Sequence, residues 1–289
     1  MYPYIEILGR EIPTYGLFSL VGILLGGWFA EHQATKHGEH PFYMIETLCV
    51  AAVGVLIGGH LLYSITNFRF IGKWSLFELF GGSVFYGGLF GGLAAGWWWV
   101  RRKGYRMNLY SDIIAMFMPL FHGFGRIGCF FGGCCFGIPS RFGILYHSPH
   151  IPESEVVTRF PVQLLESGLL FLLFVGIYLI LYRPNGRLQQ KVRGHLLEIY
   201  LATYAVIRFL DEFLRGDRIR GIWGPFSTSQ WISLTLLLVL TIRLLIRRGR
   251  TASDQAADSV SDPDQAADSG LADTILENIQ PIKNRPDGQ

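Results

Sequence analysis

The sequence is poor in charged residues. Only 16% of its 289 residues are Asp, Glu, Lys or Arg, whereas 50% are hydrophobic and 15% are aromatic. Several apolar runs are about 20 residues long, which matches the thickness of a hydrocarbon core. We therefore predict an all-α, polytopic helical membrane protein instead of the one or two soluble domains that the length alone would permit.

Excess charge of one sign is also missing. The formal net charge is only +3, which is too small to indicate a nucleic-acid partner.

The start of the chain also lacks basic residues. Residues 1–6 contain no basic side chain before the first apolar run, so a cleavable signal peptide is not expected.

Cysteine is scarce, and its spacing is unlike that of common metal sites. Cys49 lies within an apolar run, while Cys129, Cys134 and Cys135 lie close together in the sequence. These three lack a paired C-x-x-C pattern and a fixed histidine partner, so no metal site is expected. A disulfide between Cys129 and one of the vicinal cysteines stays open.

Seven membrane helices are expected, and basic residues orient them. The helices fall at residues 15–30, 46–65, 82–100, 110–131, 162–182, 195–214 and 227–246. Clusters of Arg and Lys follow the third, fifth and seventh helices, and the positive-inside rule makes that side cytoplasmic. The N-terminus is then periplasmic, the C-terminus is cytoplasmic, and loops 67–81, 133–161 and 215–226 face outward.

An arginine lies near the end of the fourth helix, within the stretch FHGFGRIGCFFGGCCFG at residues 121–137. Burying the Arg126 guanidinium costs roughly 2.5–3.5 kcal/mol on insertion scales, so an anion, a carboxylate or a water-filled cavity is expected to receive its charge. Neighbouring glycines let backbone or ligand approach closely. The alternative is a close-packed helix end from which Arg126 extends to the interface.

The sixth helix carries a second polar pattern. Tyr204, Arg208, Glu212 and Arg215 are separated by four, four and three residues and share one helical face. Together with Arg126, the arginines of this face outnumber their nearest carboxylates, and guanidinium groups bind phosphate bidentately. The alternative is a structural Arg208–Glu212 ion pair.

Other polar residues are ambiguous by themselves. Tyr86, in a glycine-rich helix, is either a catalytic phenol or an interfacial anchor, and the glycines around it permit close helix contact. His60 is either a base or a hydrogen-bonding packing residue. Gln163 and Glu166 share a face of the fifth helix, which is also an ordinary helix start.

The C-terminal segment differs in composition from the rest. An acidic, polar ten-residue unit occurs twice within residues 251–289 and contains no aromatic residue. Such a segment cannot bury a core. We therefore predict a membrane domain at residues 1–250 and a disordered cytoplasmic tail at residues 251–289.

Taken together, these motifs resemble the bacterial prolipoprotein diacylglyceryl transferases. The resemblance extends from Tyr15 to Gln230. Its most specific part is Gly125-Arg126-Ile127-Gly128 with Gly137 closing the motif. The remaining parts are Tyr86-Gly87-Gly88-Leu89, the fifth-helix run with Pro161, Gln163, Leu164 and Glu166, and the sixth-helix run with Tyr204, Arg208, Glu212 and Arg215.

The resemblance implies a bacterial inner-membrane enzyme of lipoprotein biosynthesis. Such an enzyme moves the diacylglyceryl group of phosphatidylglycerol to the lipobox cysteine thiol of a prolipoprotein and releases glycerol phosphate. The resemblance further implies that the partners of the protein are membrane lipids and not nucleic acid, and that the enzyme needs no metal or organic cofactor.

The resemblance also implies roles for the motif residues. Arg126 and Arg208 would hold the phosphate, with Arg215 at the outer entrance, and Tyr86 or His60 would take the thiol proton. The full expected set for phosphatidylglycerol binding is Arg126, Arg208, Arg215, Tyr15, Tyr204, Glu212, Gly125, Gly128, Gly137, Gln163 and Glu166.

Four positions depart from the family pattern. Tyr86 replaces a histidine, Cys129 an asparagine, Cys134 an acidic residue and His60 an arginine. These changes leave two rivals: a related transferase with a different acceptor, and a non-enzymatic phospholipid-binding membrane protein. A transporter would be expected to show inverted repeats, and none is evident among the expected helices.

Overall fold

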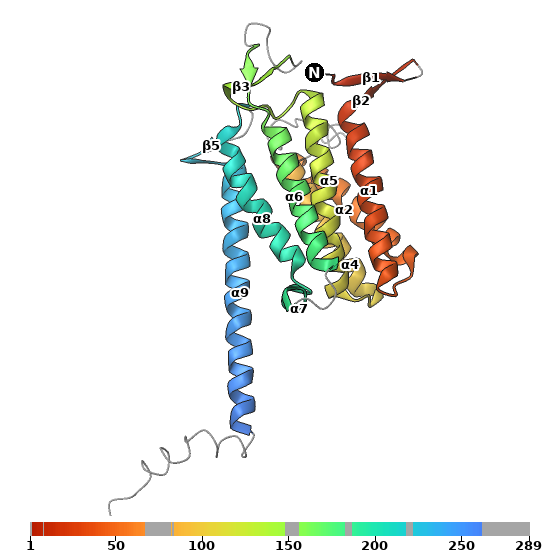
Figure 1. The fold of residues 1–289 in the computed structure, drawn as a ribbon, viewed down its shortest axis with the longest axis vertical. Helices are drawn as coiled ribbons and strands as arrows, with labels where there is room; N and C mark the ends of the chain where they lie inside the picture. The colour runs from red at the N-terminus through yellow and green to blue at the C-terminus, as the bar shows by residue number, and fades with distance from the viewer. Residues whose placement is uncertain are drawn as a thin grey trace, which may run out of the picture. The chain divides into compact units, whose positions relative to one another are not determined.

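The computed structural model describes residues 2–7, 9–66, 82, 84–147, 156–182, 187–217 and 222–261, and most of them are helical (Figure 1). The all-α prediction is therefore confirmed for the bulk of the described chain. The helices are α1 (Thr14–Lys36), α2 (Pro41–Thr66), α4 (Phe85–Lys103), α5 (Met107–Gly132), α6 (Val162–Tyr182), α7 (Arg187–Val192), α8 (Leu196–Asp211), the 3-10 turn η2 (Glu212–Leu214) and α9 (Thr228–Ser261).

Five of the described helices are long and apolar enough to cross a membrane: α1, α2, α5, α6 and α9. A multi-pass membrane protein is thus confirmed. The other two expected spans correspond to α4, which ends in Arg101, Arg102 and Lys103, and to α8, which has only 16 residues before η2. Seven spans and the orientation stay predictions.

Three small antiparallel ribbons, which the sequence analysis did not predict, cap the helices. They pair β1 (Tyr4–Ile7) with β2 (Arg10–Pro13), β3 (Pro139–Leu145) with β4 (Thr158–Arg159), and β5 (Ile222–Trp223) with β6 (Phe226–Ser227). The first two lie beside the C-terminal end of α5 (Figure 1). Tyr2 N donates to Phe131 O at 3.1 Å, which ties the N-terminal ribbon to that end.

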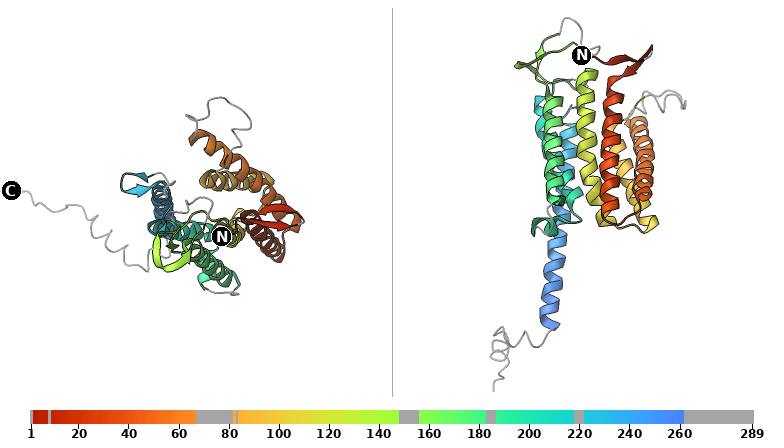
Figure 2. Two further views of the ribbon diagram at one scale, coloured as in Figure 1. Left: turned by 90° about the horizontal axis from the view of Figure 1, so that it is seen from above. Right: turned by 45° about the vertical axis from the view of Figure 1, so that its right-hand side comes forward.

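Residues Met1–Leu236 form one compact unit. Within it, α5 packs against α1, α6 and α8, while α2 packs against α4 (Figure 2). One core cluster joins α5, α6 and α8 and includes Met116, Leu170 and Tyr200. A second joins α1, α2, α4 and α5 and includes Ala34, Met44 and Tyr110. Helix α5, which carries Arg126, contributes to both clusters and is therefore packed on two sides.

Glycines bring the backbones of α2 and α4 into contact. A Cβ on Gly58 would stand 2.9 Å from Gly91 Cα, and a Cβ on Gly91 would stand 2.9 Å from Gly58 Cα. Both distances are too short for real side-chain atoms, so only glycine permits this approach. The prediction that the glycines of the third helix allow close helix contact is confirmed.

The ends of two helices differ from the predicted ones. Helix α4 begins at Phe85 instead of residue 82, because Val84 adopts an extended conformation before it. Helix α9 continues to Ser261, past the predicted start of the tail at residue 251. The second copy of the repeat lies outside the described residues, as does the whole of loop 67–81.

Candidate active site

The C-terminal ends of α5 and α8 and the N-terminal end of α6 lie at one end of the helix bundle (Figure 1). Arg126, near the end of α5, is 9% exposed, and its Nε lies 2.9 Å from Oε2 of Glu166, in the first turns of α6. Glu166 is 2% exposed. A guanidinium buried beside a carboxylate does not extend to the interface, so the alternative role for Arg126 is wrong.

Glu166 also joins α8 to this pair. Tyr204 OH donates to Glu166 Oε1 at 3.3 Å and lies 3.4 Å from His122 Nε2. His122 Nε2 is 4.0 Å from Glu166 Oε1. The structure thus brings together three predicted residues, Arg126, Glu166 and Tyr204. His122 had been given no role, although its place four residues before Arg126 puts both on one face of α5.

The second arginine has its own carboxylate. Arg208 Nη2 lies 2.6 Å from Glu212 Oε2 and donates to Ser229 Oγ, at the start of α9, at 3.1 Å. Arg208 and Glu212 are each 5% exposed. The Arg208–Glu212 ion pair, which the sequence analysis gave as the alternative for this face, is present. Arg208 Nη1 is buried and has no hydrogen-bond partner within the part of the chain that the structure describes.

The third arginine, Arg215, directly follows η2 and lies beside Gly137, the last residue of the motif that begins at Gly125. Arg215 forms two hydrogen bonds with the Asp217 carboxylate, at 3.0 and 2.7 Å. Burial opposes the charge of Arg215, but the Asp217 hydrogen bond and the negative charges of Asp217 and Cys135 together outweigh burial and raise the pKa of the guanidinium above its usual value. The backbone of Arg215 pairs with Gly137, which places the closing glycine beside it.

The expectation that the arginines outnumber their nearest carboxylates is wrong. Arg126 pairs with Glu166, Arg208 with Glu212, and Arg215 with Asp217. The physical reason is that an uncompensated buried charge costs several kcal/mol, so each buried guanidinium folds against a counter-charge. Any anion that enters this site would therefore meet arginines that are already paired.

Gln163 supports the loop after α5. Its Nε2 donates to Cys134 O at 2.8 Å and to Tyr146 OH at 2.7 Å. Burial raises the pKa of the Tyr146 phenol far above its usual value, so Tyr146 stays a neutral donor and bonds to Cys134 O at 3.4 Å. Tyr146 had not been singled out, since nothing in the sequence links it to Gln163.

The two predicted base candidates lie on the α2–α4 pair. His60 Nδ1 is 2.7 Å from Gly82 O, which ties α2 to the segment before α4 and supports the packing role. Tyr86 is half-buried and stacks against Phe90, with ring centroids 6.5 Å apart. These contacts assign neither residue as the base.

The motif glycines differ in what surrounds them. A Cβ on Gly128 would stand 3.1 Å from Tyr15 Cα, so this glycine lets α1 approach α5. A Cβ on Gly137 would overlap the Phe160 carbonyl oxygen. A Cβ on Gly125 would meet no described atom within 4 Å, so packing among the described residues does not require that glycine.

Three cysteine thiols meet next to this site. The Sγ atoms of Cys129, Cys134 and Cys135 all lie within 4.8 Å of one another. All four cysteines of the chain are free thiols here. The sequence places these three cysteines close together, but their spacing does not predict a metal site, because the approach of the thiols depends on the turn that ends α5. This cluster is the group among the described residues that could hold a metal ion.

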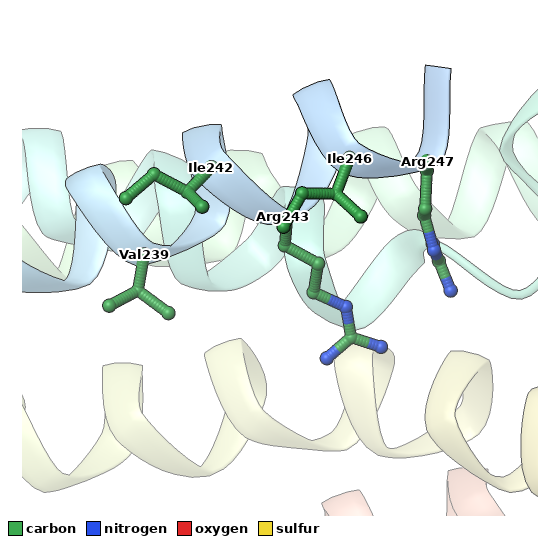
Figure 3. Close-up of a pocket in the computed structure, with 5 residues that line it drawn as sticks. All are labelled: Val239, Ile242, Arg243, Ile246 and Arg247. Atoms are coloured by element: carbon green, nitrogen blue, oxygen red, sulfur yellow. The ribbon is translucent and has the colours of Figure 1, made fainter. Parts of the chain in front are cut away.

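A hollow on α9 lies away from these residues along the chain (Figure 3). It is lined by Val239, Ile242, Arg243, Ile246 and Arg247. None of the predicted site residues is among them, and no carboxylate or thiol lines it. The hollow therefore does not coincide with the cluster around Arg126 and Arg208.

A multi-pass helical membrane protein with buried arginine–carboxylate pairs at one end of its bundle is the class that this fold and site define. The family model for prolipoprotein diacylglyceryl transferase matches residues 3–246, and the chain belongs to this family. The resemblance predicted from the motifs is confirmed.

Curated relatives support the assignment. The chain is 32% identical over 239 residues to the phosphatidylglycerol–prolipoprotein diacylglyceryl transferase of Clostridium tetani, covering 81% of this chain and 92% of the relative. It is 30% identical over 239 residues to enzyme 2 of that name from Clostridium perfringens (81% and 90%) and 31% identical over 264 residues to the Pseudomonas syringae enzyme (86% and 94%).

Proposed function

We propose that this chain transfers the diacylglyceryl group of phosphatidylglycerol to the lipobox cysteine thiol of prolipoproteins and releases glycerol phosphate. Membership of the transferase family and the names of the relatives support the donor and the acceptor class. The observation that carries the proposal is the pair of buried guanidinium groups, Arg126 and Arg208, on α5 and α8 of one buried polar cluster.

The arginines bind the phosphodiester. Glu166 engages Nε of Arg126, and no hydrogen bond to its Nη atoms occurs among the described residues, so these atoms can donate to phosphate oxygens. Nη1 of Arg208 is a buried donor without a described partner, and a phosphate oxygen would satisfy it. Both groups then stabilise the charge that grows on the leaving phosphate.

The reaction forms one bond and breaks one. The acceptor sulfur bonds to the glyceryl carbon as the carbon–oxygen bond to phosphate breaks, and the electron pair leaves with glycerol phosphate. The thiol proton must go to a base or to water, because the thiolate is the nucleophile. Tyr86 and His60 are the proposed acceptors, and Glu212 orients Arg208.

The remaining expected binding residues have supporting roles in this scheme. Arg215 stands at the outer entrance, and Tyr204 holds Glu166. Tyr15, Gly125, Gly128, Gly137 and Gln163 shape the surroundings of the lipid. The basic clusters after the third, fifth and seventh expected helices support an inner-membrane location with a periplasmic N-terminus. The family match to residues 3–246 supports a catalytic domain at residues 1–250 and a separate tail.

A related transferase with a different acceptor is the second candidate. Tyr86 and Cys129 at positions where the family carries histidine and asparagine favour it, because both substitutions fall where the acceptor thiol would react.

Complementation tests the proposal. A bacterium depleted of its own transferase receives this chain, and intact-mass measurement of a lipoprotein reports the added diacylglyceryl group. We expect full modification with the wild-type chain and none with Arg208→Ala, provided that membrane fractions contain both proteins equally. An unmodified lipoprotein in cells that insert the wild-type chain would contradict the proposed acceptor.

A further inference from the structure

The turn that ends α5 brings two thiols together. Gly133 has φ 73° and is left-handed, Cys134 N donates to Cys129 O at 3.2 Å, and Gly133 N donates to Phe130 O at 3.3 Å. This is the paired hydrogen bonding of a Schellman motif, in which the residues at the two ends of the turn contact each other. Those residues are Cys129 and Cys134.

A second left-handed residue adds the third thiol. Cys135 has φ 56° and is the one residue other than glycine with a positive φ in the described part of the chain. A cysteine rarely adopts this conformation, and such outliers concentrate at functional sites. The hydrogen bonds from Gln163 and Tyr146 to Cys134 O hold the turn in place. The three thiols are therefore held together by the fold of the turn.

The separation of the thiols suits a metal ion. With zinc–sulfur bonds of about 2.3 Å, three thiolates at the corners of a tetrahedron stand about 3.8 Å apart. The observed Sγ atoms lie within 4.8 Å of one another, so small side-chain rotations complete the set. A set of three thiolates selects thiophilic ions over Mg²⁺ or Ca²⁺.

The surrounding charge also suits such a complex. Three thiolates and a divalent ion carry a net charge of −1, which burial alone would disfavour. Arg126 precedes Cys129 by three residues on α5, and both Arg126 and Arg215 interact electrostatically with Cys135. The two guanidinium groups stabilise an anionic metal–thiolate centre.

We propose that Cys129, Cys134 and Cys135 bind a thiophilic divalent cation of the Zn²⁺ class, and that its open fourth position binds the acceptor thiol. Zinc sites with three protein ligands leave such a position for substrate. On binding, the three S–H bonds of the cluster break and their protons pass to water; the S–H bond of the acceptor thiol breaks as its sulfur binds the ion, and that proton passes to Tyr86 or His60, the acceptors of the proposed function. The role of the fourth position rests on the proposed function.

Metal content tests the site directly. The full-length chain is purified in detergent, loaded with Zn²⁺, desalted and measured by mass spectrometry of the metal. We expect about one zinc per chain, falling below about 0.2 in each of Cys129→Ser, Cys134→Ser and Cys135→Ser. Cys49→Ser is the matched control, since its thiol lies elsewhere on α2, and should keep the metal. Thermal unfolding confirms that each variant is folded.

Two results would overturn the site. One is a folded, fully reduced wild-type chain that retains no more zinc than the triple serine variant. The other is a disulfide within the cluster, shown by thiol titration and by the mass of the protein isolated from cells. That protein would then bind Zn²⁺ only after treatment with a reductant.

Cobalt reports on the fourth position. Co²⁺ loaded in place of Zn²⁺ should give thiolate charge-transfer absorption, and a lipobox peptide should shift its visible bands only when it contains cysteine instead of serine. The shift should also occur in Arg208→Ala, which still has the cysteine cluster but lacks a phosphate-binding residue. No shift at saturating peptide would overturn the acceptor role.

The outcomes separate this inference from the proposed function. If the chain restores lipoprotein modification and the three serine variants do so equally well, the metal site fails as part of the reaction while the transferase stands. If zinc binds at about one per chain but wild-type protein modifies no lipoprotein, the metal site stands and the proposed acceptor fails.

Discussion

Arg126 Nε lies 2.9 Å from Glu166 Oε2, so the guanidinium of α5 is held by a carboxylate from α6. Arg208 and Glu212 form a similar pair, 2.6 Å apart, across one turn at the end of α8. Tyr204 connects the two regions by its hydrogen bond to Glu166. The arginines are thus oriented before any lipid binds, which reduces the reorganisation needed during transfer.

Replacing Arg126 or Arg208 by alanine should lower transfer at least about 100-fold, the usual cost of losing one donor to a developing negative charge. Lysine should also be poor at either position, because a point charge lacks the planar fork. Transfer of labelled diacylglyceryl to a lipobox peptide measures this in detergent, with insertion checked by gel filtration. Near wild-type turnover in both alanine variants would remove phosphate binding from their roles.

Glu212→Gln should destabilise the fold by about 3–5 kcal/mol, because it leaves the buried Arg208 guanidinium without its counter-charge. The double variant Arg208→Met with Glu212→Leu should recover most of the stability without recovering transfer. Unfolding in detergent measures the first effect, and the peptide assay the second. A double variant that is stable and also active would show that the pair serves packing alone.

Gly137→Ala should destabilise the protein strongly, since its Cβ would overlap the Phe160 carbonyl oxygen. Gly125→Ala is the matched control for stability: its Cβ meets no described atom, and alanine favours a helix by up to about 1 kcal/mol over glycine. The unfolding temperature should fall in the first variant and stay or rise in the second. If Gly125 leaves room for the lipid, its variant should show weaker phosphatidylglycerol binding while remaining stable.

Tyr86→Phe should cut the rate of transfer strongly with little loss of phosphatidylglycerol binding, if the phenol takes the thiol proton. Tyr86→His should recover part of the rate, because imidazole titrates nearer neutrality. Rate and binding are measured separately by single-turnover transfer and by lipid titration. Full activity in Tyr86→Phe would make the phenol an anchor, leaving His60 as the next residue to replace.

The predicted orientation places the start of the chain outside the cell and the end of α9 inside. A membrane-impermeant maleimide should label Tyr2→Cys in intact spheroplasts and label Ser259→Cys only after permeabilisation. The parent chain, with its four native cysteines, gives the background. Labelling of Ser259→Cys from outside would reverse the orientation.

The sequence predicted the features that depend on local spacing. Apolar runs gave the helices, and the four-residue separation gave the Arg208–Glu212 pair. The sequence could not predict the pairing of Arg126 with Glu166, because the two residues are 40 positions apart in the chain and only packing shows which helix faces meet. The sequence placed Cys129, Cys134 and Cys135 near one another but did not predict how the three thiols meet, since that depends on two left-handed residues, Gly133 and Cys135.

The glycine contact between α2 and α4 limits where lipid can reach the site. With Gly58 and Gly91 in backbone contact, acyl chains cannot pass between these helices without separating them. A phospholipid that reaches the arginines from the bilayer must therefore enter between other helices, because the α2–α4 pair forms a closed boundary. Crosslinking α2 to α4 should accordingly leave lipid exchange unimpaired.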